Sequence, residues 1–533
     1  MDWQTRERVR YMEKLWCMVG LAVGLAVCPL WAKDSLRISP IGSYTTGRIG
    51  EGVAEIIAYH APQKRLFSIN TADRCVDIFD FASPGSPWPI GKVELAEFGS
   101  APTSVSMRSD VLAASIVGKT PNDRGTVVFF TPDGVRLASV PVGYHPDMVM
   151  FSPDGKWLIV ANEGEPSADG LVDHDGSVSV IEVPTGLESF AAQLQVREAD
   201  FATWNDQPLP AGVRLAQPGN RPSTDFEPEG IAISGDSRTA FISLQENNAI
   251  AVVDLAEAKV KRIFGLGYKD HRLAENEVDV FGLGHEKEIT CCPAKGMYQP
   301  DNVVWFTSGG KEYLILANEG DARDNLQYHE ESQLKDWKLD PQKFPNAEAI
   351  LAKYGSLIVS RTGDIDQDQD LDEILTFGGR SISIFDSQGT FVFDSGSQIE
   401  HHVCRRLDSH QHDPEDTKPK YRTKKGPEPE GLCLATLNGK TYVFVGLERD
   451  NGIVAWDVTS PQQPELVAYV NPFECKNDKV DPTGDMGPEG LVFVPAQDSP
   501  NGMPLLIVAN EYSGSITVYQ VDVVSGLTAA VKR

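Results

Sequence analysis

Residues 428–458, "EPEGLCLATLNGKTYVFVGLERDNGIVAWDV", decide the fold. A proline–acid pair opens a short apolar strand, and a polar turn leads to a second apolar strand that ends in Leu447 and Glu448. A turn with Asn451 and Gly452 precedes a third strand. Short apolar strands separated by turn signals are typical of an all-β protein.

The same order of features recurs along the chain. Clear copies also begin at His145, Glu227, Gln299 and Gly487, and two looser copies begin at Gly52 and Ala101. Five clear copies and two looser ones make seven. Units of about four strands that repeat in this way predict a β-propeller. We therefore predict an all-β fold, a seven-bladed β-propeller over residues 35–524.

The ends and the insertions of this propeller are also visible. The last copy stops at its third strand, so we expect residues 35–46 to supply the fourth. This pairing of N- and C-terminal strands would remove an exposed edge. Long insertions lie at residues 183–223, 255–298, 323–380 and 400–427. Long loops on a rigid scaffold often carry function, although decoration is the alternative.

Charge and the N-terminus limit the partners and the location. The 533 residues include 76 acidic and 48 basic side chains, a formal net charge of −28. Such a polyanion repels nucleic acid and anionic membranes. Residues 1–32 combine a basic stretch with an apolar run, which predicts a secretory signal peptide, with a retained anchor as the alternative. We expect a periplasmic or secreted monomer without a stable membrane span after signal removal, and a C-terminal tail at residues 525–533.

The acidic stretch "TGDIDQDQDLDEI", residues 362–374, fits a calcium loop. Alternating carboxylates can turn toward one centre, and calcium takes six to eight oxygen ligands. Gln369 stands where such loops usually have glycine, and Leu375 stands where an EF-hand has glutamate, so the loop is not an EF-hand. A solvated acidic loop is the alternative. The predicted ligands of a structural calcium are Asp364, Asp366, Asp368, Asp370 and Asp372.

A second acidic group follows from the repeats. The first strands of a propeller line its channel, so residues at their starts meet at one mouth, and the antiparallel second strands end there. Acids in a partly dry mouth need bound metal, basic partners or protons. Another divalent metal besides calcium could serve, and the alternative is that these acids cap turns and pair between blades. The predicted mouth consists of Asp147, Glu163, Glu227, Glu229, Asp301, Glu319, Asp321, Arg323, Glu428, Glu430, Glu448, Arg449, Glu489 and Glu511.

Other motifs are weaker. A histidine-rich segment, residues 401–412, has the spacing to hold a transition metal, but its polar surroundings favour a loop with adventitious metal affinity. The sequence contains no G-x-S-x-G, no P-loop, no HExxH and no G-x-G-x-x-G after a strand. No nucleophile–base pair is therefore indicated.

Several motifs together resemble a known family. They are "DFEPEGIAIS" from Asp225, "LILANEGDARD" from Leu314, the acidic segment from Gly363, "GPEPEGL" from Gly426 and "GPEGLVFV" from Gly487. They resemble the choice-of-anchor I family of secreted bacterial proteins, which is similar to mesenchyme-specific cell-surface glycoproteins of biomineralising animals. The resemblance covers roughly residues 41–521. It implies a seven-bladed propeller outside the cytoplasm, an alkaline-phosphatase label for some members and calcium association for the animal relatives, but no catalytic residues.

Two functions remain open. The first is a non-catalytic calcium-binding propeller that binds a small-molecule or surface ligand through its acidic mouth. The alternative is a metal-dependent phosphoesterase, alkaline phosphatase- or phytase-like, that uses the same mouth. A plain binding module predicts that every acid of the mouth is paired. Catalysis predicts metal and phosphate near Glu229, Glu319, Asp321 and Glu430.

Overall fold

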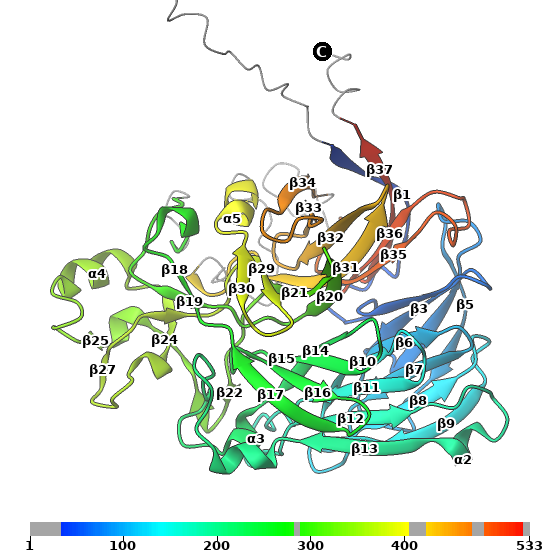
Figure 1. Cartoon of the computed structure of the whole chain (residues 1–533), viewed down its shortest axis with the longest axis horizontal. Coiled ribbons are helices and arrows are strands. Elements are labelled where there is room, and N and C mark those ends of the chain that lie inside the picture. Colours follow the sequence, from blue (N-terminus) through cyan, green and yellow to red (C-terminus); the bar gives the residue numbers. More distant parts are fainter. Residues whose placement is uncertain (1–33, 282–287, 404–422, 472–483, 526–533) are drawn as a thin grey trace, which may run out of the picture. The chain divides into compact units, whose positions relative to one another are not determined.

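The computed structural model describes residues 34–281, 288–403, 423–471 and 484–525 (Figure 1). Arg37–Asp522 forms one compact unit. The predicted signal peptide, most of the predicted tail, His410 and His412 lie outside the described residues. Within the described residues, no helix has the length and apolar character needed to cross a membrane.

The described residues form seven four-stranded sheets, one for each predicted repeat. The first two are β2 (Ile57–His60), β3 (Arg65–Asn70), β4 (Cys75–Asp80) and β5 (Trp88–Glu94), and β6 (Pro102–Arg108), β7 (Val111–Ile116), β8 (Thr126–Phe130) and β9 (Arg136–Pro141). The third and fourth are β10 (Pro146–Phe151), β11 (Trp157–Asn162), β12 (Ser177–Glu182) and β13 (Gln195–Asp200), and β14 (Pro228–Ile233), β15 (Thr239–Leu244), β16 (Ala249–Asp254) and β17 (Lys259–Gly265).

The last three sheets have the same strand order with one exception. The fifth and sixth are β20 (Val303–Ser308), β21 (Lys311–Asn318), β29 (Ser381–Asp386) and β30 (Phe391–Asp394), and β31 (Pro429–Leu437), β32 (Lys440–Leu447), β33 (Gly452–Asp457) and β34 (Glu465–Val470). The seventh is β35 (Pro488–Val494), β36 (Leu505–Asn510), β37 (Ser515–Val524) and, from the N-terminus, β1 (Ser35–Thr45). The predicted closure by the N-terminal strand is therefore confirmed.

The sheets form a closed ring. Their innermost strands contact one another in the order β2, β6, β10, β14, β20, β31 and β35, and β35 contacts β2. Apolar clusters lie between adjacent sheets, and one of them joins Trp157 of the third blade to Ile242 of the fourth. At the closing blade, the guanidinium of Arg37 lies 2.9 Å from the carboxylate of Asp522. The fold is a seven-bladed β-propeller.

The proline–acid pair has a local structural reason. Proline is the first residue of β10, β14, β31 and β35, a position where its missing N–H is tolerated. In each of these strands the register with the second strand shifts just after the proline. Such a bulge re-aims the side chain that it carries. The acid that follows the proline is thereby turned out of the regular ladder.

A glycine after the acid brings neighbouring blades together. A Cβ on Gly431 would lie 1.9 Å from the carbonyl oxygen of Glu489, and one on Gly490 would lie 2.3 Å from that of Glu55. No side chain fits at such a distance. The third residue of the Pro-acid-Gly motif therefore allows the innermost strands of adjacent blades to pack closely.

The insertions are partly blade and partly separate structure. Two segments that the sequence placed in insertions, β13 and β17, are the fourth strands of their blades. Apolar residues from 278–294 and 334–374, among them Phe281, Tyr354 and Leu371, form a core of their own. The helix α4 (Ala347–Tyr354) belongs to this segment, which Figure 1 shows at the left.

The smaller elements lie in these connections. Those of the second and third predicted insertions are β18 (Tyr268–Asp270), η2 (Ala274–Asn276), β19 (Lys295–Met297), β22 (Asp324–Asn325), β23 (Tyr328–His329), β24 (Glu331–Gln333), η3 (Leu334–Asp336), β25 (Lys338–Leu339), β26 (Ile358–Ser360), η4 (Arg361–Gly363), β27 (Asp370–Leu371) and β28 (Leu375–Thr376). The others are α2 (Phe190–Gln193), η1 (Ala202–Asp206), α3 (Pro222–Asp225) and α5 (Gln398–Val403).

We predict that Gly431→Ala lowers the free energy of unfolding by about 1–3 kcal/mol, because the methyl group overlaps a backbone carbonyl of the next blade. Gly91→Ala is the matched control, since Gly91 has no neighbour within 4 Å of its Cβ position. We expect it to change stability by less than about 0.5 kcal/mol. Chemical denaturation of both variants measures the difference, and equal midpoints would contradict the role given to the motif.

Candidate functional site

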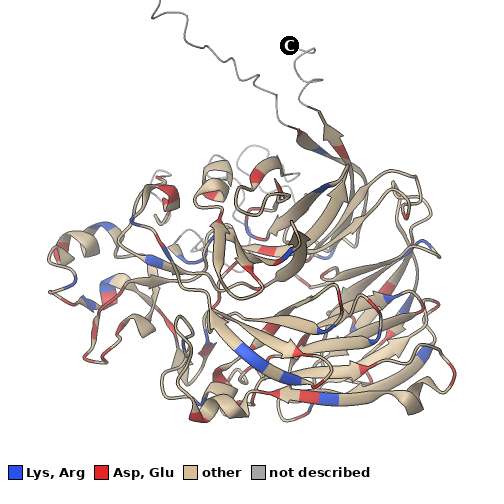
Figure 2. Ribbon diagram, viewed as in Figure 1, with Lys and Arg blue, Asp and Glu red and all other residues tan. Residues whose placement is uncertain are grey.

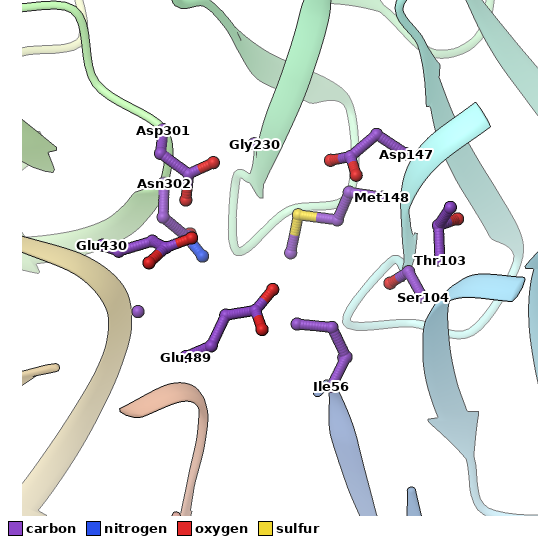
Figure 3. Close-up of a pocket in the computed structure, with 11 residues that line it drawn as sticks. Ile56, Thr103, Ser104, Asp147, Met148, Gly230, Asp301, Asn302, Glu430 and Glu489 are labelled. Atoms are coloured by element: carbon purple, nitrogen blue, oxygen red, sulfur yellow. The ribbon is translucent and has the colours of Figure 1, made fainter. Parts of the chain in front are cut away.

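The channel mouth contains an inner ring of carboxylates, one from the same repeat position in each of six blades. In the second blade this position is Thr103, whose hydroxyl donates to the carbonyl of Pro146. Figure 3 shows four of the acids pointing into a common space from different blades. The inner ring consists of Glu55, Asp147, Glu229, Asp301, Glu430 and Glu489.

A cavity of about 80 Å³ lies inside this ring. Asp147, Asp301, Glu430 and Glu489 line it with carboxylates, and Met148 contributes an apolar side chain (Figure 3). Because a cavity needs only about 10–15 Å³ to hold one water, this space can take an ion with several waters.

Several of these carboxylates have an oxygen that lacks a partner. The Oε2 atoms of Glu229, Glu430 and Glu489 are buried and accept no hydrogen bond from any described residue. The same holds for Glu246, which is only 5% exposed. A buried oxygen without a partner costs about 1–3 kcal/mol, and more when it is charged. The mouth is therefore not the fully paired arrangement expected of a plain binding module.

Burial and mutual repulsion keep the inner ring from full ionisation. Burial, and then the neighbouring carboxylates, raise the pKa values of Glu229, Asp301, Glu430 and Glu489 well above the ordinary range. Burial and Glu163 raise the pKa of Asp147 to about 7. In the metal-free protein, part of the ring therefore holds protons near neutral pH.

An outer tier of acids surrounds the inner ring, and five of its six members contact a basic side chain. It comprises the residues that end the second strands and those that precede the prolines. The ammonium of Lys425 lies 2.5 Å from Glu319 and 3.3 Å from Glu428. Arg449 contacts Glu428 at 3.3 Å and Glu448 at 3.0 Å. The outer tier consists of Glu163, Glu227, Glu319, Glu428, Glu448 and Glu511.

Arg323 neutralises a further part of the mouth. Its side chain is fully buried, pairs with Glu227 and lies 2.6 Å from Asp173. Burial lowers the pKa of Lys425, but the carboxylates of Asp321 and Glu319 outweigh burial, and the pKa lies well above the ordinary value. Arg323 and Lys425 are therefore permanent counter-charges of the outer tier. Figure 2 marks the acidic and basic residues along the ribbon.

The asparagine of each Asn-Glu pair is structural. The amide of Asn162 donates to the hydroxyls of Ser177 and Ser179 on the third strand. Asn318 makes the same two contacts, 3.1 Å each, with Ser381 and Ser383. The two residues of the pair therefore have different roles. The asparagine links the second strand to the third, and the glutamate faces the mouth.

Two groups of acids in the mouth lie close enough to share an ion. The carboxylates of Asp301, Glu319 and Glu430 have ligand atoms within 4.8 Å of one another, and so do those of Glu319, Glu428 and Glu448. Carboxylate-only sites suit hard cations such as calcium. The donor set of the mouth therefore fits calcium.

The predicted calcium loop keeps part of its ligand set together. Ligand oxygens of Asp364, Asp366 and Asp372 lie within 4.8 Å of one another. Asp368 instead accepts a hydrogen bond of 3.1 Å from the backbone of Asp370. Gln369 makes the turn with a φ of 76°, in the left-handed region that glycine favours. The loop lies between β21 and β29, as the repeats predict.

Sequence reasoning missed four residues of the mouth. Glu55 stands at the inner-ring position in "VAEII", where the proline is absent, and an alignment of the first copy would have revealed it. Glu246 in "LQENN" is displaced by one residue from the Asn-Glu position. His145 precedes the proline of the third copy, and Lys425 precedes the sixth copy in an insertion. Only the fold brings Lys425 to Glu319.

The fold and the site define a class, a seven-bladed propeller with an acidic channel mouth. Residues 55–461 match the choice-of-anchor I domain, and the chain belongs to this family. This membership indicates an extracellular or cell-surface protein. Gigasin-3a of Magallana gigas is 26% identical over an alignment of 187 residues, which covers 32% of this chain. The chain spans 65% of Gigasin-3a, less than two thirds of that protein's length.

Solved structures with a similar arrangement are distant in sequence. Hydrazine synthase of Kuenenia stuttgartiensis is 15% identical, with a TM-score of 0.47 over 90% of this chain and 99% of its own. The Cps50 (Swd1) β-propeller domain of Myceliophteria thermophila is 10% identical, with a TM-score of 0.44 over 91% of this chain and 100% of its own. The WD40 domain of Toxoplasma gondii coronin is 8% identical, with a TM-score of 0.46 over 93% of this chain and 88% of its own.

We predict that Glu55→Gln stabilises the metal-free protein at alkaline pH. Burial raises the pKa of Glu55 to about 8, from an ordinary value of 4.5. The folded state therefore holds a proton that the unfolded state has released, and this contribution to stability is lost as the pH rises from 4.5 through 8. The melting temperature of the variant should equal that of the wild type at pH 4.5 and exceed it at pH 8.5.

Thermal melting in chelator at both pH values measures this effect. Glu97→Gln, at an exposed glutamate in the connection between β5 and β6, is the control. Its melting temperature should equal that of the wild type at both pH values. If the melting temperature of Glu55→Gln does not exceed that of the wild type at pH 8.5, the charges of the inner ring do not destabilise the fold.

Proposed function

We propose that this protein works outside the cytoplasm, in the periplasm or after secretion, as a calcium-dependent binding propeller. The inner ring binds a hard divalent cation, and the loaded mouth binds a small-molecule or surface ligand. A second calcium in the loop at residues 364–372 holds the large insertion of the fifth blade in shape.

One observation carries this proposal. The buried Oε2 atoms of Glu229, Glu430 and Glu489 have no partner among the described residues, and the last two side chains line a cavity large enough for an ion. Buried charge persists in proteins when it is paired or coordinates a metal. A divalent cation in this cavity would satisfy several of these oxygens at once.

The pairing of basic residues in the mouth favours cation binding over hydrolysis, even though the unpaired oxygens of the inner ring depart from the fully paired mouth expected of a plain binding module. Phosphoryl transfer uses cationic groups, metal ions or basic side chains, that are free to contact the phosphate. Lys425 is buried among three carboxylates, and Arg323 is fully buried between two. Both cations are thus committed to protein carboxylates, which suits a mouth that selects a cation.

We predict that Glu430→Gln and Glu489→Gln each lower the calcium affinity of the mouth at least about tenfold, about 1.4 kcal/mol, because each removes one charged ligand. Isothermal titration of chelator-stripped, full-length protein measures the affinity. Glu312→Gln, at an exposed glutamate in β21, is the control and should bind as the wild type. Unchanged affinity in both ring variants would refute the proposed mouth site.

The loop site has its own test. We predict that Asp364→Asn combined with Asp372→Asn removes one equivalent of calcium and reduces the rise in melting temperature that calcium produces, because a ligand of the folded state alone stabilises it. Glu430→Gln is the control and should keep the part of the rise in melting temperature that calcium in the loop produces. An identical calcium response in wild type and the double variant would end the loop assignment.

A further inference from the structure

Three side chains of the third blade bring one nitrogen and two oxygens together at the rim of the mouth. The Nδ1 atom of His145 lies 2.7 Å from Oε2 of Glu163 and 3.1 Å from Oε2 of Glu165. All three ligand atoms lie within 4.8 Å of one another. The side chains are 32%, 14% and 54% exposed, so an ion can reach them from solvent.

The backbone holds these side chains in place. The N–H of Glu163 donates to the carbonyl of His145 at 3.0 Å, and that of Gly164 donates to Tyr144 at the same distance. Gly164 has a φ of 70°, and a Cβ there would lie 2.8 Å from the carbonyl of His174. This tight turn brings Glu165 back toward the imidazole, so the three groups meet without a long flexible connection.

The imidazole is special to this blade, whereas its backbone is not. His145 precedes the proline with a φ of 45°, and the equivalent residues of the fifth and sixth blades, Gln299 and Glu428, have φ values of 45° and 50°. The left-handed conformation therefore recurs in other blades without the histidine. Glutamine is a native occupant of this position, which makes His145→Gln compatible with the fold.

A cavity of about 210 Å³ adjoins the cluster. His145 and Glu165 line it together with Lys119, Tyr144 and His174. The ring of His174 stacks on Tyr144 with centroids 3.6 Å apart, and its Nε2 atom is buried without a hydrogen-bond partner among the described residues. The cavity leaves room for a water or another exogenous ligand next to the cluster.

We propose that His145, Glu163 and Glu165 bind a divalent transition-metal ion, zinc, with an open coordination position that faces this cavity. An imidazole with two carboxylates is a donor set for zinc, whereas calcium takes oxygen alone. Ligand atoms of a tetrahedral zinc site lie about 3.4 Å apart, since its bonds are about 2.1 Å long. The two contacts of the Nδ1 atom, 2.7 and 3.1 Å, lie within about 0.7 Å of that spacing.

Zinc binding exchanges one cation for another. A proton on the Nδ1 atom of His145 must leave before that atom can bind zinc, because the ligand is the neutral imidazole. Zinc replaces that proton, which leaves to solvent, and the two carboxylates remain negative as ligands. None of its three ligands belongs to the inner ring, so its test is separate from that of the calcium proposal.

The test uses chelator-stripped, full-length protein titrated with Zn²⁺ and, for its visible absorption, with Co²⁺. We expect His145→Gln to lose one tight equivalent of zinc and the absorption of four-coordinate cobalt, and Glu165→Gln to weaken zinc binding at least about tenfold. Glu430→Gln should keep both signals. A melting curve with calcium confirms that each variant is folded.

The histidine-rich segment needs its own control, because adventitious zinc there would mimic a site. A variant with His410→Gln and His412→Gln should keep the equivalent that His145→Gln loses. Equal zinc stoichiometry and cobalt absorption in wild type and His145→Gln, or loss of the signal only in the His410 and His412 variant, would overturn the proposal.

Discussion

Charge repulsion inside the channel is the constraint on which the rest of this structure depends. Seven innermost strands converge on one axis, and six of them bring a carboxylate to the same level. Carboxylates in a confined, partly dry space must be paired with cations or hold protons. The protein meets this demand in the outer tier with Arg323, Lys425 and Arg449. Among the described residues, no basic side chain forms an ion pair with the inner ring, and the calcium proposal rests on this difference.

One motif serves both the fold and the site. The proline begins the innermost strand, the bulge after it turns the acid into the channel, and the glycine lets the next blade approach. Tight packing of Gly431 against Glu489 also fixes how close the carboxylates come to one another. The repeat that closes the propeller therefore concentrates the charge. Binding sites commonly retain a local destabilisation of this kind, and favourable contacts elsewhere in the scaffold offset it.

Local features of the sequence were sufficient for most of the fold. Strand periodicity, turn residues and the repeated Pro-acid and Asn-Glu pairs predicted the blades, the closing strand and the acidic mouth. The fourth strands β13 and β17 were hidden in apparent insertions, because outer strands carry fewer apolar residues. Contacts between segments that are distant in the sequence could not be predicted. Lys425 meets Glu319 across 106 residues, and no spacing rule links them. The asparagine of the Asn-Glu pair also had no visible structural role until its serine partners on the third strand were known.

The most direct test of the account is where a calcium substitute binds. Crystals of the full-length protein grown with terbium, which takes oxygen ligands as calcium does, give an anomalous map that locates each ion. We expect a peak inside the channel, within bonding distance of inner-ring carboxylates that line the cavity, Asp301, Glu430 and Glu489. A channel that holds only water, with its carboxyl groups bonded to one another and every peak at the surface, would contradict it.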